Sequence, residues 1–378
     1  MLVQFAIMWH IVLETKSGAM MTIYILVAVL PTFFTSLLGG IWADRYNKKH
    51  LINLADGSIA LISLAIAISL SIGIDSIALL MIAACVRALG QGVQQPAVNS
   101  LVPLIVPKDN LLRINGINSS IQSGICLLSP MVAALLMSLA SLELLFFIDV
   151  ITAAIAIAIL YFIVKVPHAT IEKKNTDNAS IFKDLICGFK FLKCQKFLLR
   201  LVVLSGLYTI FLTPLLVLFP LQITRNFGDD LWRLSAVEIG QAAGMIVGGL
   251  LIGVCCFRNK IYAIGASSIV IGILTVSLGF WTNFTLYLVC IVIFGLSWPY
   301  FSAPSVTLIQ ERVASEYLGR VSSVFTILLS LALPFGMLFF GPLADIVNIN
   351  HIFIGTGVVM VFLGIMYFAS KTLREAGI

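Results

Sequence analysis

Charged residues are scarce in this chain of 378 residues: only 11% of its positions are Asp, Glu, Lys or Arg, against about 25% in an average soluble domain. This excludes a soluble globular domain. Hydrophobic residues make up 60% of the chain and recur in runs of about 20 residues, the length with which a helix crosses a bilayer. Runs such as LISLAIAISLSIGI are apolar on both faces, which excludes the alternating strands of a membrane barrel. The sequence therefore predicts an all-α polytopic membrane protein.

The chain also lacks the motifs of several enzyme classes. It has no Gly-x-x-x-x-Gly-Lys-Ser/Thr loop, so we expect no ATP hydrolysis by the chain itself. Its seven cysteines include no Cys-x-x-Cys pair, and five of them lie in apolar runs as small hydrophobic residues. The four histidines are scattered: His10, His50, His168 and His351. We expect no enzyme activity, no metal and no cofactor.

Eleven apolar runs are long enough to span a membrane. A twelfth run, residues 1–13, is too short, and we interpret it as half of a first span that follows a shortened or misassigned start. A signal peptide is the alternative, but no basic segment and no small-residue cleavage pattern precede Glu14. About 11.5 of 12 spans are thus expected. The eleven runs lie near 18–42, 51–74, 77–102, 114–140, 144–164, 197–223, 234–256, 261–281, 284–309, 318–342 and 350–369.

Basic residues indicate which side of the membrane each loop occupies, because Lys and Arg accumulate in cytoplasmic loops. With the loop at 39–50 placed inside, nineteen of the 23 Lys and Arg residues fall inside or at the inner boundary. Only Lys16, Arg225 and Arg233 fall outside, and Arg87 lies within a span. Both termini are therefore predicted to be cytoplasmic. This rule also explains the net charge of +6, so no nucleic-acid partner is needed.

A long polar stretch divides the chain into two halves of six spans, residues 1–165 and 197–378, joined by residues 166–196. We expect the stretch to begin as a flexible linker and to continue as an amphipathic helix on the inner membrane surface. A repeat supports the division: PAVNSL precedes DNLLR in the first half, and PSVTL precedes EYLGR in the second. Duplicated six-span halves are typical of secondary transporters that rock two bundles about a central site.

Glycines recur every four residues in the predicted span at 234–256. Gly240, Gly244 and Gly248 follow this spacing, and Gly249 and Gly253 repeat it. Small residues at this spacing allow membrane helices to approach closely. The pattern predicts a close-packing seam along this span.

The segment GGIWADRYNKKH at 39–50 resembles the loop between spans two and three of the major facilitator superfamily. Gly39 or Gly40, Asp44, Arg45, Lys48 and Lys49 match its pattern. Asn47 stands where the family often has glycine, and we attribute this to the left-handed backbone that asparagine can adopt.

The resemblance implies that this loop latches a cytoplasmic gate. The glycine would pack on the eleventh span, and Asp44 would face the positive N-terminal end of that helix near Leu318. Arg113 and Arg320, the paired arginines of the repeat, complete the predicted gating set. For the two lysines, setting the topology is a sufficient role.

Nearly the whole chain resembles the macrolide-efflux permeases of bacteria, a proton-linked branch of that superfamily. Segments such as RALGQGVQQPAVNSLVPLIVPKDNLLRINGINSS, EIGQAAGMIVGGLLIG and LADIVNINHIF carry the likeness. It implies a monomeric drug/proton antiporter of the bacterial inner membrane that works by alternating access on macrolide-type or similar amphipathic compounds. The alternatives are a siderophore or other metabolite exporter of the same fold, or a truncated membrane protein that does not transport.

Polar residues inside the apolar spans are the candidates for the transport pathway. Arg87, Gln91, Gln94 and Gln95 share one face of a helix. An arginine at a helix centre costs roughly 2.5–3.5 kcal/mol, so Arg87 should face a wet cavity or a carboxylate. The resemblance implies proton coupling for Arg87, and an ion pair that only holds the bundle together is the alternative.

Candidates on other spans complete this set. Span five carries a polar face in which Gln122 lies deepest. A proton-coupled carrier also needs a carboxylate that loses and regains a proton, and Asp149 and Glu238 are the leading candidates, ahead of Glu14 and Asp56.

Overall fold

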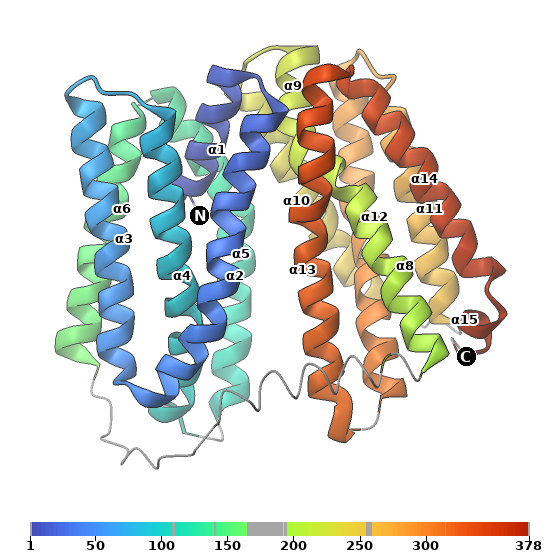
Figure 1. Ribbon diagram of the computed structural model, residues 1–378, viewed down its shortest axis with the longest axis horizontal. Helices are drawn as coiled ribbons and strands as arrows, with labels where there is room; N and C mark the ends of the chain where they lie inside the picture. Colours follow the sequence, from blue (N-terminus) through green and yellow to red (C-terminus); the bar gives the residue numbers. More distant parts are fainter. Residues whose placement is uncertain are drawn as a thin grey trace. The chain divides into compact units, whose positions relative to one another are not determined.

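The computed structural model describes residues 2–107, 110–139, 141–164, 192, 195–254, 259–313 and 315–376, and these residues form helices without a single strand. Ten of the helices are long and apolar enough to cross a membrane. The chain divides into two compact units, in each of which the long helices run side by side (Figure 1). Unit 1 comprises Met1–Thr15 and Ile23–Lys174, and unit 2 comprises Lys16–Thr22 and Asn175–Ile378.

Unit 1 is built on α3, which packs against both α4 and α6. A second set of contacts joins α1 to α4, α5 and α6. Both α4 and α6 therefore lie against the same helix, α3. The helices are α1 (Leu2–Thr15), α2 (Gly18–Arg45), α3 (Lys48–Ser71), α4 (Ile77–Ile105), α5 (Leu111–Leu139) and α6 (Leu142–Ala158), which continues into a π-helical turn, η2 (Ile159–Ile163).

Glycines and threonines bring α2 close to α4. A Cβ added at Gly92 would lie 1.9 Å from the Thr35 hydroxyl oxygen, and one at Gly39 would lie 2.7 Å from the Gly92 carbonyl oxygen. Thr32 donates a hydrogen bond of 3.0 Å to the carbonyl of Ala88. Gly39 is therefore required for packing within unit 1, a role that the sequence did not indicate.

The expected spans agree with the helices. The short first run forms a helix of 14 residues. The span expected near 114–140 lies within α5, in which the described stretch Leu128–Ser138 is apolar. The predicted linker at 166–196 lies outside the described residues except for Leu192, Gln195 and Lys196, so its amphipathic helix stays a prediction.

Unit 2 begins with a long apolar span over Lys196–Phe227. Its helix changes register at Pro214, which has no N–H to donate to the ladder, and a π-helical turn follows there. In this unit α11 packs against α12 and α14, and α8 against α13 and α14. The elements are α8 (Lys196–Thr213), η3 (Pro214–Leu218), α9 (Phe219–Phe227), α10 (Leu231–Val254), α11 (Lys260–Leu278), α12 (Phe284–Arg312), α13 (Ser315–Ile346), α14 (Ile349–Ala369) and α15 (Lys371–Ala376).

The predicted glycine seam joins α10 to α12. A Cβ at Gly244 would lie 2.3 Å from the Val292 carbonyl oxygen, and one at Gly248 would lie 2.2 Å from that of Leu296. Gly240 also faces α12, so the prediction is confirmed for these three residues. It is wrong for Gly249, because a Cβ there would meet no described atom within 4 Å. The packing around Gly253 is not described by the structure, so the prediction for this residue stays a prediction.

This seam yields a paired test. Gly244→Ala should force α10 and α12 apart, because the new methyl group meets backbone atoms, and should destabilise the fold by about 1–3 kcal/mol. Gly249→Ala enters open space and should be neutral or stabilising by about 1 kcal/mol. Thermal unfolding of the two variants in detergent measures the difference. Equal melting temperatures would refute the seam.

Candidate functional site

Three side chains meet where α3, α4 and α6 come together, those of Ser63 and Arg87 buried and that of Asp149 partly buried. The Arg87 guanidinium on α4 donates from Nη1 to the Asp149 carboxylate on α6 at 2.5 Å and to the Ser63 hydroxyl on α3 at 2.7 Å. Ser63 in turn donates to the same carboxylate oxygen of Asp149 at 2.8 Å. A longer contact of 3.4 Å joins Arg87 Nη2 to the second carboxylate oxygen. The three residues form a closed ring of hydrogen bonds, which we call the Ser63 triad.

Burial makes the pairing in this triad necessary. The Arg87 side chain is 8% exposed and that of Asp149 is 24% exposed, while Ser63 is fully buried. Removing one partner of a buried ion pair typically costs about 3–5 kcal/mol, because the other charge is left uncompensated. The structure therefore meets the expectation that Arg87 faces a carboxylate, and it identifies that carboxylate as Asp149.

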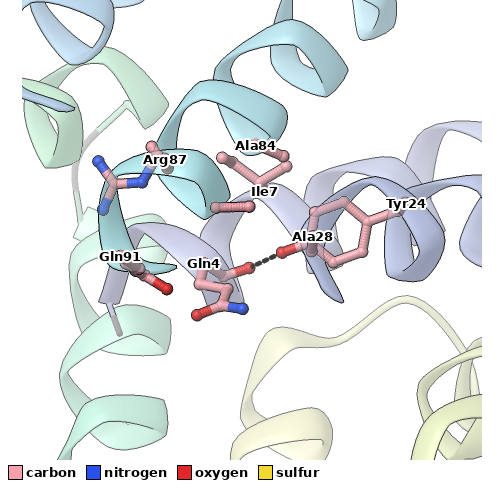
Figure 2. Close-up of a pocket in the computed structure, with 8 residues that line it drawn as sticks. Gln4, Ile7, Tyr24, Ala28, Ala84, Arg87 and Gln91 are labelled. Atoms are coloured by element: carbon pink, nitrogen blue, oxygen red, sulfur yellow. Dashed lines mark hydrogen bonds between the residues drawn. The ribbon is translucent and has the colours of Figure 1, made fainter. Parts of the chain in front are cut away.

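A small pocket lies beside Arg87 within unit 1. It is lined by Gln4, Ile7, Tyr24, Ala28, Ala84, Arg87, Ala88 and Gln91. Figure 2 shows Arg87 and Gln91 on one side of this pocket and Tyr24 on the other, with Gln4 between them. The Tyr24 hydroxyl donates to the Gln4 carbonyl at 2.9 Å. The pocket thus combines apolar walls with amide groups and one guanidinium.

The other members of the predicted polar face on α4 have separate environments. Gln91 lines the pocket. Gln94 donates to the Asp56 carboxylate on α3 at 2.7 Å, and Gln95 is exposed. Residues on one helical face therefore line a pocket, bind a second carboxylate and lie at the surface.

Two candidates form no described contact with the triad. Gln122, expected to lie deepest in span five, is exposed on α5. Glu238 lies in the second turn of α10 in unit 2, where it is half-buried and forms no hydrogen bond or ion pair with a described residue. Neither is joined to the triad by a described contact.

The predicted gating segment is mostly helical. The α2 helix continues through Arg45, and α3 begins at Lys48. Asn47 has φ −63° and ψ 114°, and its side chain caps α3 by accepting from the Lys49 amide. The left-handed conformation expected for Asn47 is wrong, because an N-cap residue takes an extended backbone. The side chains of Asp44, Arg45, Arg113 and Arg320 lie outside the description.

Lys49 has a structural role that topology alone does not explain. Its ammonium group donates to the carbonyls of Tyr161 at 2.7 Å and Val164 at 3.0 Å and lies 5.5 Å from the centre of the Tyr161 ring. These carbonyls end the η2 turn, where a helix has no further N–H donors. Lys49 therefore holds the start of α3 to the end of η2, whereas Lys48 forms no bond with a described residue.

The three basic residues expected outside the membrane are all paired, and all three pairs lie in unit 2. Their ion pairs are Lys16 with Asp229 at 2.6 Å, Arg225 with Asp345 at 3.0 Å and Arg233 with Asp230 at 3.2 Å.

Asp345 also caps the first turn of α2. Its carboxylate accepts from the Ser17 hydroxyl at 2.7 Å, the Gly18 amide at 2.7 Å and the Ala19 amide at 2.9 Å. These orphan amides at a helix N-terminus attract a negative charge. Asp345, at the end of α13, thus anchors the segment Lys16–Thr22 within unit 2.

The sequence did not indicate Ser63 or Asp345. A serine in an apolar span is common and usually bonds to its own helix, so Ser63 carried no signal by itself. Asp345 lies at the end of a span, where a carboxylate is ordinarily solvated. Its one signal was the presence of outer arginine and lysine residues that needed partners.

Together, the all-helical fold, the repeated membrane spans and a buried ion pair within a bundle define a multi-pass membrane transporter. The sequence profile of the Major Facilitator Superfamily matches residues 2–337. The chain belongs to this superfamily.

Relatives and solved structures agree with this family. The macrolide efflux protein A of Streptococcus pyogenes is 32% identical over 97% of this chain and 90% of its own length. The macrolide efflux protein A of Enterococcus faecalis is 34% identical over 79% of this chain and 93% of its own length. An enterobactin exporter of Escherichia coli is 22% identical over 78% of this chain and 69% of its own length. The D-xylose–proton symporter structure shares the fold, with a TM-score of 0.70 at 13% identity, covering 99% of this chain and 97% of that one.

The role of Lys49 can be tested against its neighbour. Lys49→Met removes two charge-assisted hydrogen bonds to carbonyls and should lower the stability of the fold by roughly 1–3 kcal/mol. Lys48→Met removes the same charge from the same loop but no bond to a described residue, and should be nearly neutral. Thermal unfolding in detergent compares the two. Equal losses would mean that charge, and not capping, is what this loop needs.

Proposed function

We propose that this chain is a proton-coupled exporter of macrolide-type or similar amphipathic compounds. The observation that carries the proposal is the buried Arg87–Asp149 pair beside a pocket of mixed apolar and amide character. The two macrolide efflux relatives, at 32% and 34% identity, support the cargo class. The protein would lie in the bacterial inner membrane with both termini in the cytoplasm and would act as a monomer.

Proton exchange would proceed at Asp149. In the ionised state its carboxylate neutralises Arg87. A proton that binds Asp149 removes this negative charge, and the buried Arg87 guanidinium then lacks a counter-charge, which is unfavourable in a region of low dielectric. Arg87 already lines the pocket, so it can turn toward the amide oxygens of Gln4 and Gln91. Proton binding would thus change the polarity of the pocket, and this change would couple proton entry to cargo release.

The pocket residues suggest how a cargo is recognised. Ile7, Ala28, Ala84 and Ala88 offer apolar contact, while Gln91 offers an amide that can donate and accept. The pocket is small, so it would contact one group of an amphipathic compound and would not enclose the whole of it. We propose Gln91 as a cargo contact, with Gln94 and Gln95 further along the same helix, Gln122 on α5 and Glu238 on α10 as additional contacts or proton carriers.

The gating role of the 39–50 segment remains part of the proposal. Asp44 lies in the last turn of α2, next to the short connection to α3, so its charge sits near a helix end. A latch to the first turn of α13 would exploit the positive end of that helix. Arg45, Lys48, Arg113 and Arg320 would line the same cytoplasmic side.

The pairing of the outer basic residues supports the proposed orientation. Lys16, Arg225 and Arg233 are the exceptions to a cytoplasmic excess of positive charge, and each has an ion pair that explains its presence. The exceptions therefore reflect structure and do not oppose the topological rule.

An exporter of siderophores is the second candidate. It is favoured by the enterobactin exporter relatives, at 22% identity. Their lower identity and shorter coverage place this candidate behind the macrolide class. A chain that does not transport at all is the remaining alternative, and the same assay separates the three.

Transport should depend on the Arg87–Asp149 pair. In everted vesicles, the wild-type chain should accumulate a radiolabelled macrolide when a proton gradient is imposed, and a protonophore should abolish this accumulation. Asp149→Asn should abolish gradient-driven accumulation while macrolide–macrolide exchange across the membrane continues, because exchange requires no net proton movement. Ser58→Ala, which removes a hydroxyl that donates within α3, is the control and should resemble the wild type.

Each other outcome excludes a specific part of the proposal. If Arg87→Ala retains full gradient-driven efflux, the pair is only structural. If the wild type moves a catecholate siderophore and no macrolide, the second candidate is correct. Movement of neither compound in either assay would favour a chain that does not transport.

The latch can be tested through Asp44. Asp44→Asn removes the charge but keeps the shape, and should lower macrolide export several-fold while the amount of protein in the membrane is unchanged. Accumulation of macrolide by cells that express equal amounts of variant and wild type measures this. Unchanged export would exclude Asp44 from the gate.

A further inference from the structure

We infer that Ser63 is a positioning residue for proton exchange, whose hydroxyl stabilises the ionised form of Asp149 and fixes its orientation toward Arg87. This inference rests on the proposed function, because it concerns the same carboxylate. It adds a third member to the pair, one on a different helix.

The Ser63 hydroxyl both donates and accepts a hydrogen bond within the triad. A hydroxyl has one hydrogen to donate and two lone pairs that accept. The hydrogen of Ser63 is directed to Asp149 Oδ2 at 2.8 Å, and a lone pair accepts from Arg87 Nη1 at 2.7 Å. Ser63 therefore bridges the two charges of the pair and is itself fully buried.

Other hydroxyls in unit 1 behave differently. Serines and threonines in helices usually donate to a carbonyl three or four residues earlier in their own helix. Ser58 donates to Ala55, Ser71 donates to Ala67, and Thr32 donates to Ala28 as well as to Ala88. The Ser63 hydroxyl instead reaches across to a carboxylate on another helix. Its bond is tertiary, so generic satisfaction of a polar group within α3 does not explain it.

The packing of α3 explains why this position can bridge the pair. Because α3 packs against both α4 and α6, one of its faces meets both the arginine and the carboxylate. Ser63 is the polar residue of α3 at this level. Asp56, the carboxylate of the same helix, lies two turns away and is bonded to Gln94.

Protonation of Asp149 would reverse the hydrogen bond. A carboxylate only accepts, whereas a carboxylic acid has a hydrogen to donate. When Asp149 takes a proton, Ser63 can accept from it and turn its own hydrogen toward the carbonyl of its helix four residues earlier, that of Ile59. A hydrogen bond to the charged form favours that form. Loss of the hydroxyl should therefore change the pH dependence of transport.

The other ionisable groups near α6 are few. Arg87 on α4 is the charged group that contacts Asp149. On α1, which packs against α6, His10 lies 3.3 Å from Asp75, and Glu14 lies one turn further along that helix. On α6 itself Glu143 lies in the first turn, and on α3 Asp56 is held by Gln94. The side chain of Arg113 on α5 lies outside the description. No described contact links any of these except Arg87 to Asp149.

The test is the pH profile of transport by Ser63→Ala. The purified protein is reconstituted in liposomes, and macrolide movement driven by a fixed proton gradient is measured as the pH of both compartments is varied together. The pH of half-maximal transport should shift by about half a unit or more, which is a threefold change in proton concentration. Ser63→Thr, which keeps the hydroxyl, should restore the profile. Ser58→Ala, which removes a half-buried hydroxyl that donates within α3, is the matched control and should leave it unchanged.

The possible failures are distinguishable. If Ser63→Ala transports with the wild-type profile while Asp149→Asn abolishes gradient-driven transport, the inference about Ser63 is wrong and the proposed function stands. If the wild type shows no gradient-driven transport, the proposed function itself fails. Should Ser63→Ala not fold, Ser63→Cys, with a weaker donor of similar size, is measured in its place. A wild-type profile for that variant also overturns the inference.

Discussion

The structure of unit 1 depends on one constraint: a guanidinium placed inside a membrane-spanning bundle must have a counter-charge. Arg87 is almost completely buried, and no neutral group can offset its charge in a region of low dielectric. Its need for Asp149 fixes the register of α4 against α6, and the Ser63 hydroxyl ties α3 to both. In the proposed mechanism the same constraint would make the site responsive, since a single proton on Asp149 would remove the compensation. Stability and proton coupling would thus depend on the same few atoms.

Most of the fold could be predicted from the sequence, because helix length and apolarity are local properties. The spans, the glycines at 240, 244 and 248 and the carboxylate opposite Arg87 all followed from spacing or from the cost of an isolated charge. The prediction for Gly249 was wrong because the four-residue spacing does not indicate on which side of the helix a neighbouring helix lies. Asn47 failed because the family pattern suggested a turn, whereas the short connection is closed by a helix cap.

Local sequence patterns did not predict which residues pair with one another in the candidate site. The helical spacing places Arg87, Gln91, Gln94 and Gln95 on one face of α4. The residues around Arg87, Gln91 and Gln94 come from α1, α2, α3 and α6, and only the tertiary packing assigns them. Asp149 was named as a carboxylate, but not as the partner of Arg87. Ser63 was not identified, because its role depends on the residues that it contacts on other helices. Membership of the superfamily constrains the architecture but does not supply these pairings.

The ion pairs of the two units differ in their exposure to solvent. The side chains of Lys16 and Asp229 are about half exposed, and those of Arg225 and Asp345 are more than a quarter exposed, whereas Arg87 is shielded. Dissolved salt largely screens exposed charges that lie more than about 8–10 Å apart and weakens exposed ion pairs, whereas it affects buried charges much less. Ionic strength therefore acts on the two regions unequally. A rise in salt would loosen the anchor at the beginning of α2 while leaving the Ser63 triad intact, so ionic strength would act on one without altering the other.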